Sequence, residues 1–154
     1  MATNDRIDFL RTVPLFREVG KRDLERLADA VIERTFDPGA SIVEEDTLGT
    51  TFMVIVDGEA EAVTVATGEE TVVAALGAGD YFGELALFEN ERRSASVRAK
   101  TAVTCLVFTR WDFLAELRHT PELAVQMLIA TMRRLRATTG ELAVARGEDG
   151  PTVQ

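Results

Sequence analysis

The chain has 154 residues, of which 46% are apolar and 28% charged, and its formal net charge is −9. That length suits one domain with its own hydrophobic core, and the acidic balance argues against a nucleic-acid or anionic membrane surface. No apolar run approaches the ~20 residues of a membrane span, and the N-terminus lacks the apolar segment of a secretory signal. The single Cys105, in an apolar run, is expected to be a buried thiol, which fits a reducing cytoplasm.

Two helices are expected at the N-terminal end. The apolar residues between positions 7 and 16 predict a short helix that breaks at Pro14. Between 21 and 33, apolar residues recur at the helical spacing i, i+3, i+4 and i+7, so we expect an amphipathic helix with Gly20 in the N-cap position. The apolar face of that helix comprises Leu24, Leu27, Ala28 and Val31.

The middle of the chain is rich in Val, Ile and Thr and predicts short strands separated by turns. Asp57-Gly58 and Thr67-Gly68 are typical of hairpin turns. Regularly spaced short strands indicate a sandwich or barrel, and a short helix opened by Gly83 is expected to interrupt it. The expected strands cover residues 41–44, 51–56, 59–66, 71–76, 94–100 and 103–109.

Helices return after Arg110. A short amphipathic helix is expected over 111–117, and Thr120 followed by Pro121 is typical of the N-cap and first position of another helix. The periodicity of the last helix continues past Thr139, although Gly140 weakens it. We therefore expect a mainly β domain with flanking helices over residues 7–145, followed by a disordered tail over 146–154.

Three leucines in the last helix recur every seven residues: Leu128, Leu135 and Leu142. Such spacing is compatible with a seam between two copies of the helix, and a homodimer through this helix is one reading. The alternative, which we favour from the sequence alone, is that this face packs on the β domain.

The stretch 81–101 carries the strongest functional signal. Positions 35–91 contain no Lys or Arg and hold 13 acidic residues, after which Arg92 and Arg93 arrive together. Helix N-termini and arginines both bind anions, so the helix opened by Gly83 and the two arginines predict an anion site.

Strand alternation distinguishes the two arginines. From 94 to 100 the odd positions are apolar and the even positions polar, which directs Ala95, Val97 and Ala99 inward. Extended backwards, this alternation places Arg93 inside and Arg92 outside. A buried arginine needs an anion, and two partners remain open: an internal salt bridge to Glu84, or a phosphate held together with helix amides.

The motif FGELALF followed by RRSASVRAKT resembles the phosphate-binding cassette of cyclic-nucleotide-binding domains, as in bacterial catabolite activators and cAMP-dependent kinase regulatory subunits. The resemblance extends over about residues 9–139. It implies a jelly-roll-like double-stranded β-helix with N-terminal helices and two C-terminal helices.

The resemblance also implies roles for individual residues around the cyclic phosphate. Gly83 would allow close approach of the backbone, and the amides of Leu85 and Ala86 would face the phosphate. Arg93 would pair with the phosphate, with a hydrogen bond from Ser94, and Glu84 would accept the ribose 2′-hydroxyl. The loop from Phe88 to Arg92 is about one residue shorter than in the activators, which could shift Arg93 slightly.

The purine and sugar would be contacted by residues elsewhere in the chain. The resemblance implies that two threonines of the last helix reach the purine edge, whereas three strand residues line the base or sugar pocket. Of the strand residues, Val73 and Leu76 are also expected to be core residues. These residues are Thr138 and Thr139 on the helix, and Ala62, Val73 and Leu76 on the strands.

The sequence therefore predicts a cyclic-nucleotide sensor, with cAMP favoured over cGMP, that signals to a partner protein by moving its last helix. The alternative is a related module that has lost the ligand and acts through protein contacts. An enzyme is not expected, because metal-dependent barrels usually need several histidines and this chain has only His119, in a helix connection. No cofactor is expected. Direct DNA binding is not expected either, because activator relatives carry a DNA-binding helix-turn-helix after the long helix and this chain ends soon after it.

Overall fold

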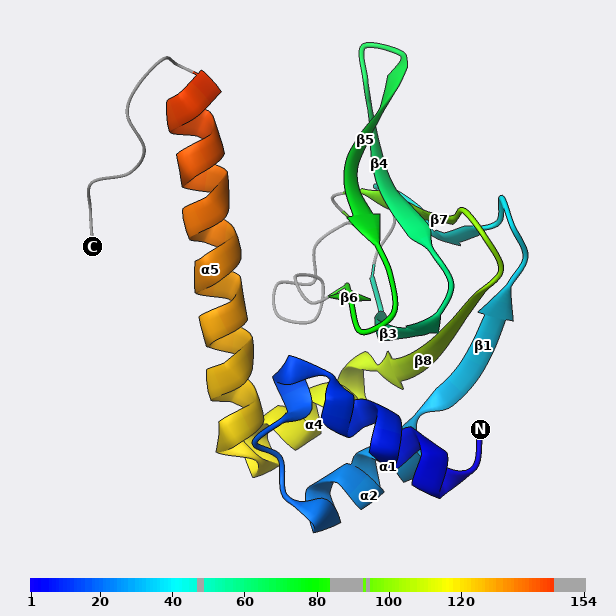
Figure 1. Ribbon diagram of the computed structural model, residues 1–154, viewed down its shortest axis with the longest axis vertical. Helices are drawn as coiled ribbons and strands as arrows, with labels where there is room; N and C mark the ends of the chain where they lie inside the picture. The colour runs from blue at the N-terminus through cyan, green and yellow to red at the C-terminus, as the bar shows by residue number, and fades with distance from the viewer. Residues whose placement is uncertain (47–48, 84–92, 94, 146–154) are drawn as a thin grey trace.

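The computed structural model describes residues 1–46, 49–83, 93 and 95–145, with the side chains of residue 66 and of 138–145 excepted. Helices from both ends of the chain flank a β-roll, at one end of it and along one side (Figure 1). The helical elements are α1 (Thr3–Thr12), the 3-10 turn η1 (Pro14–Phe16), α2 (Lys21–Ala30), α4 (Arg110–His119) and α5 (Pro121–Ala145). The strands are β1 (Ile32–Phe36), β2 (Ser41–Val43), β3 (Thr51–Asp57), β4 (Ala60–Ala66), β5 (Glu69–Leu76), β6 (Tyr81–Phe82), β7 (Ser96–Ala99) and β8 (Val103–Thr109).

The strands form two four-stranded antiparallel sheets. One sheet has the order β1-β8-β3-β6 and the other the order β2-β7-β4-β5. Apolar side chains from both sheets meet between them, among them Ile55, Val97 and Cys105. The mainly β architecture with flanking helices that the sequence predicted is confirmed.

A second core lies between the helices and the outer face of the first sheet. Successive residues of β3 serve the two cores in turn: Phe52 and Val54 face the helices, whereas Met53 and Ile55 face the other sheet. This explains why β3 reads as a continuous apolar run, because a strand covered on both faces needs apolar side chains at every position.

Aromatic rings join this helical core to the first sheet. The Phe52 ring lies 4.3 Å from the Phe113 ring of α4 and 5.4 Å from the Tyr81 ring of β6, measured between centroids. Phe108 of β8 lies between Phe113 and Phe16 of η1. The first half of α4 and the start of β6 are therefore packed on the same residue, Phe52.

The N-terminal prediction is partly wrong. The expected helix over 21–33 ends at Ala30, because Val31 is extended at ψ 152° and the chain enters β1. Ile32 pairs with Val107 of β8, so a long-range strand pairing overrides a helical periodicity. The buried face of Leu24, Leu27 and Ala28 and the N-cap position of Gly20 are confirmed.

The C-terminal helices agree with the prediction in position but not in packing. The periodicity beyond Thr139 is confirmed, since α5 continues to Ala145. In contrast, the favoured packing of the leucine face on the β domain is wrong, because Leu128 is 59% exposed and Leu135 66% exposed. Figure 1 shows α5 rising from α4 beside the roll. Leu142 and the predicted tail 146–154 lie outside the described side chains.

None of the helices within the described ranges is both long enough and apolar enough to cross a bilayer.

Candidate functional site

Gly83 directly follows β6 and adopts a backbone conformation that other residues rarely adopt. Its φ is +95°, in the left-handed region, directly after the pairing of Phe82 with Met53 of β3. A Cβ built on Gly83 would lie 2.5 Å from Nη1 of Arg93 and 2.7 Å from the carbonyl oxygen of Thr51. The sequence therefore needs glycine here for two reasons, the backbone angle and the close approach of a guanidinium.

Arg93 is the buried cation of this site. It is 9% exposed, and its Nη2 donates to the Thr51 carbonyl at 2.9 Å and to Thr51 Oγ1 at 3.2 Å. Its own carbonyl accepts from the backbone N–H of Asp46 at 2.9 Å. The predicted inward orientation of Arg93 is confirmed, as is the inward orientation of Val97 and Ala99, which are 4% and 1% exposed.

The predicted ligand contacts around Arg93 fall partly beyond what the structure describes. Glu84, Leu85, Ala86, Ser94 and Arg92 lie outside the described residues, as does the short helix expected to begin at Gly83. Their roles, and the choice between a salt bridge to Glu84 and a phosphate, stay predictions.

Sequence reasoning missed Thr51. Its carbonyl oxygen and hydroxyl both accept hydrogen bonds from Arg93, 42 positions along the chain. A main-chain carbonyl is present in every residue, so no side-chain pattern could have singled it out. The only sequence signal is a polar residue at the first position of an otherwise apolar strand.

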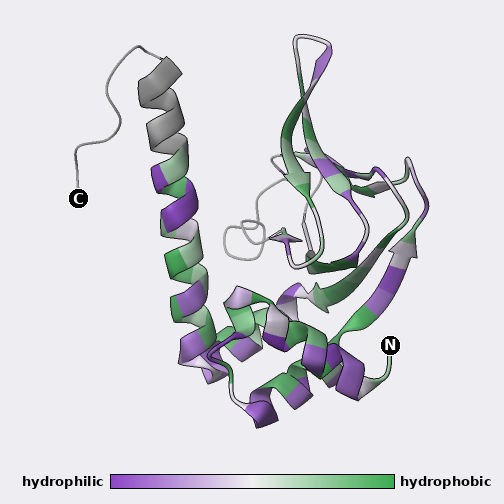
Figure 2. Ribbon diagram, in the orientation of Figure 1, coloured by the Kyte–Doolittle hydropathy of each residue, from purple (hydrophilic) through white to green (hydrophobic). Residues whose placement is uncertain are grey.

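The predicted pocket residues of β4 and β5 occupy different environments. Ala62 and Leu76 are partly buried and pack against the core between the sheets. Val73 is 55% exposed, like the rest of β5 before Leu76, because β5 is the edge strand of its sheet and its residues there are not covered by other described elements. The expectation that Val73 is a core residue is therefore wrong, and its role toward a ligand stays a prediction. Figure 2 shows the hydrophobic colouring of β5, whose Val72 and Val73 are exposed.

The backbones of Thr138 and Thr139 lie in α5, and their side chains are outside the description. Arg134 links α5 to β6, because its Cζ lies 4.6 Å from the centroid of the Tyr81 ring. Tyr81 precedes Gly83 by two positions, so α5 touches the strand that enters the candidate site.

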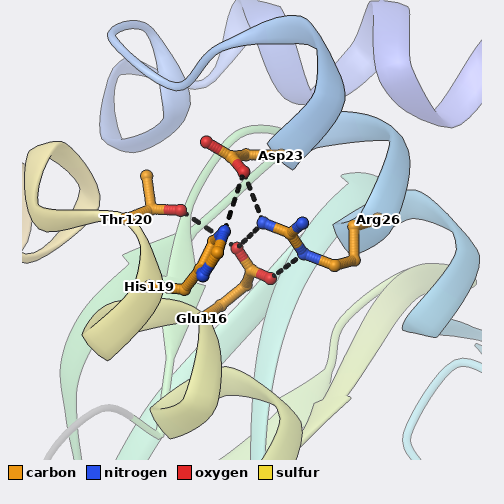
Figure 3. Close-up of polar contacts among 5 residues, drawn as sticks. All are labelled: Asp23, Arg26, Glu116, His119 and Thr120. Carbon is orange, nitrogen blue, oxygen red and sulfur yellow. Dashed lines mark hydrogen bonds and ion pairs between the residues drawn. The ribbon is translucent and has the colours of Figure 1, made fainter.

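A polar cluster holds the base of α5 (Figure 3). Glu116 of α4 is 7% exposed and accepts from Arg26 of α2 and from the Thr120 hydroxyl at 3.1 Å. The hydrogen bond with Glu116 raises the pKa of Arg26 above its ordinary value. Thr120 occupies the expected position before Pro121, although its hydroxyl binds Glu116. The cluster therefore fixes the α4–α5 junction to the N-terminal helices.

His119 lies at the edge of this cluster, with Nε2 3.8 Å from Oδ1 of Asp23, and its side chain is 63% exposed. Among the residues that the structure describes, no group of three or more His, Cys, Asp or Glu side chains could hold a metal ion. The sequence placed His119 in a helix connection; it is the last residue of α4, directly before the connection to α5.

Cys105 is fully buried in the core between the sheets, and burial raises the pKa of its thiol to about 12. The prediction of a buried thiol is confirmed.

Comparison with known proteins agrees with this geometry. Residues 33–120 match the cyclic nucleotide-binding domain family. The chain is 41% identical over 93 residues to a cAMP-dependent protein kinase regulatory subunit of Yarrowia lipolytica, covering 60% of this chain and 24% of that protein. The curated relative is thus about four times as long as the aligned region.

Two solved structures share the fold. The catabolite activator protein of Thermus thermophilus has a TM-score of 0.79 and 29% identity, covering 86% of this chain and 63% of that one. The regulatory domain of Toxoplasma gondii PKA, solved with cAMP, has a TM-score of 0.76 and 27% identity, covering 84% of this chain and 50% of that one.

Proposed function

Because the chain belongs to the cyclic nucleotide-binding domain family, we propose that it senses a cyclic nucleotide monophosphate, with cAMP as the preferred ligand. One observation carries the proposal: a 9% exposed Arg93 guanidinium lies against Gly83, where the backbone leaves room for no side chain. A buried cation beside a glycine, which has no side chain to keep a ligand from the backbone, suits a compact anion such as a cyclic phosphate. Binding and release are then the whole chemistry, without a cofactor or a catalytic step.

The ligand would be held from several sides. Arg93, Ser94 and the amides of Leu85 and Ala86 would bind the cyclic phosphate, with Gly83 allowing the approach. Glu84 would accept the ribose hydroxyl, while Ala62, Val73 and Leu76 would line the sugar and base. The exposed position of Val73 supports such a role, because an apolar side chain at 55% exposure gains from being covered.

The signal would pass through α5 to a partner protein. Thr138 and Thr139 would contact the purine, so the ligand favours one position of α5 over another. Fixation of the base of α5 by Glu116, together with the looser Arg134–Tyr81 contact further along, supports a motion that pivots near Thr120.

Self-association through α5 is a second part of the proposal. Four apolar residues of α5 recur at alternating intervals of three and four, and each is between 51% and 66% exposed. This is the spacing of a two-helix seam. They are Val125, Leu128, Met132 and Leu135, and the same spacing reaches Leu142.

Isothermal titration with cAMP and cGMP tests ligand binding. An affinity near 1 µM corresponds to about −8 kcal/mol, and removal of a buried charge partner costs about 2–5 kcal/mol. We therefore expect Arg93→Ala to weaken binding at least ~30-fold. Arg98→Ala is the matched control, since Arg98 is on the same stretch of chain but ion-pairs outside with Glu70 and Glu61.

The alternative function is a module of this fold that works through protein contacts alone. Absence of heat and of any melting shift at millimolar cAMP and cGMP would favour that alternative. The buried Arg93 would then serve an internal ion pair.

A further inference from the structure

The Arg93 guanidinium donates two hydrogen bonds to Thr51. Nη2 of Arg93 donates to the carbonyl oxygen of Thr51 at 2.9 Å and to its hydroxyl at 3.2 Å. The two acceptors come from the same residue, so together they fix both the position and the rotation of that end of the guanidinium.

The Thr51 carbonyl lies two positions before the described pairing of β3 with β6. Within the described residues, that pairing covers only Met53–Phe82 and Val54–Tyr81. Gly83 follows with φ +95°, and the Arg93 guanidinium donates to the Thr51 carbonyl. Arg93 thus satisfies a main-chain acceptor of β3.

The other side of Thr51 is rigid. Thr51 pairs with Thr109 of β8, and Thr109 Oγ1 accepts from the N–H of Asp112 as the N-cap of α4. The neighbouring Thr50 carbonyl accepts from the N–H of Arg110 at 2.9 Å. Thr51 is therefore held by the sheet and by the start of α4, and can act as a fixed support for a long side chain.

An arginine side chain has several rotatable bonds, and immobilising it when a ligand arrives reduces affinity. We propose that Thr51 is the positioning residue of the anion site: its carbonyl and hydroxyl hold the Arg93 guanidinium at the Gly83 turn before the ligand binds. The effect on ligand affinity rests on the proposed function, whereas the positioning of Arg93 rests on its two hydrogen bonds to Thr51. Thr51 itself touches no ligand in this scheme.

The binding experiment compares three variants by titration with cAMP. Thr51→Val has the same shape without the hydroxyl, Thr51→Ser keeps the hydroxyl, and Thr50→Val changes the exposed neighbouring threonine. Loss of one hydrogen bond should weaken binding about 3- to 10-fold in Thr51→Val. Thr51→Ser should stay within about 2-fold of wild type, and so should Thr50→Val. Equal weakening by Thr51→Val and Thr51→Ser would overturn the proposal.

A second readout needs no ligand. In arginine-selective nitrogen NMR of the ligand-free protein, a guanidinium held at Nη2 rotates slowly and shows separate Nη–H signals, which Arg93→Lys assigns by their loss. We expect these signals to merge in Thr51→Val and in Thr51→Ala but not in Thr51→Ser. Unchanged rotation in both variants, with melting temperatures showing that they fold, would overturn the proposal.

The cAMP titration and the NMR comparison distinguish a failure of the proposed function from a failure of the positioning role of Thr51. If wild type binds neither cAMP nor cGMP, the proposed function fails, and the NMR comparison alone decides whether Thr51 positions Arg93. If the guanidinium is released in Thr51→Val and the cAMP affinity stays that of wild type, the positioning role is overturned.

Discussion

Nε of Arg26 lies 2.5 Å from Oε1 of Glu116, and this ion pair joins α2 to the helix that precedes α5. Removing only the arginine leaves the mostly buried carboxylate of Glu116 without its charge partner. Replacing both residues by apolar ones leaves no unpaired buried charge. We expect Arg26→Met to lower the melting temperature by about 3–6 °C, and Arg26→Met/Glu116→Met to recover part of that loss. Arg22→Met, one turn earlier on the exposed side of α2, is the control. A double variant less stable than the single one would contradict this account.

Alanine substitution should destabilise the protein to different extents at two glycines, Gly79 and Gly83, that have almost the same φ. Gly79 has φ +90° and its added Cβ would meet nothing within 4 Å, whereas that of Gly83 would meet Arg93 and Thr51. We expect Gly79→Ala to cost about 1 kcal/mol and Gly83→Ala about 2–3 kcal/mol of unfolding free energy. Urea unfolding measures both, and equal losses would show that the close approach at Gly83 is unimportant.

The exposed seam of α5 predicts the oligomeric state. Light scattering after gel filtration should give twice the 16.9 kDa chain mass for wild type and a single chain mass for Leu128→Glu/Leu135→Glu. Ala137→Glu introduces the same charge on the same helix away from the seam and should leave the dimer intact. A wild type that is monomeric at 100 µM or so would rule out the seam as a stable interface.

The exposed pair of Glu70 and Arg98 predicts a titration change. The hydrogen bond from Arg98 holds the pKa of Glu70 below its ordinary value, at a distance of 2.7 Å. A carboxylate whose pKa is lower in the folded state adds stability above the unfolded pKa, and this is lost as pH falls through the folded pKa. In a carbon-detected NMR titration, Arg98→Ala should raise the pKa of Glu70 toward its ordinary value. An unchanged Glu70 pKa would contradict the contact.

Burial of Cys105 predicts an unreactive thiol. Its pKa is raised from 9.0 to about 12, so the folded protein keeps the thiol protonated where the unfolded chain would ionise it. Stability contributed by this group is present below pH 9 and falls as pH rises toward 12. Ellman's reagent at pH 8 should react only after unfolding, and Cys105→Val should reduce the alkaline loss of stability. Rapid labelling of the folded protein would show that the site opens easily.

The sequence predicted the parts of the fold that depend on local patterns. Strand alternation was enough to place Arg93 inside and to orient Val97 and Ala99, because each side chain alternates with its neighbour. Local patterns could not show that the helix stops at Ala30, where the pairing of Ile32 with Val107 takes over, or that Val73 lies on an exposed edge strand. Both errors come from how segments distant in sequence are arranged.

The residues of the candidate site also differ in whether the sequence could predict them. Gly83 and Arg93 stand out as side-chain types with a known chemistry, and the structure brings them together. Thr51 contributes a carbonyl, which the identity of a residue does not reveal. The exposure of Leu128 depends on where α5 lies relative to the roll, and helical spacing alone is equally compatible with a buried face.

The Arg134–Tyr81 contact gives the protein an optical and magnetic reporter of its own. Tyr81 is the single tyrosine of the chain, and its ring lies beneath a charge carried by α5 and against Phe52. A fluorine introduced on tyrosine would therefore produce one resonance, located two residues before Gly83 and sensitive to the distance of the Arg134 guanidinium on α5. The position of α5 becomes measurable inside cells or in mixtures without an attached dye, and each candidate ligand can be ranked by how far it displaces that one signal.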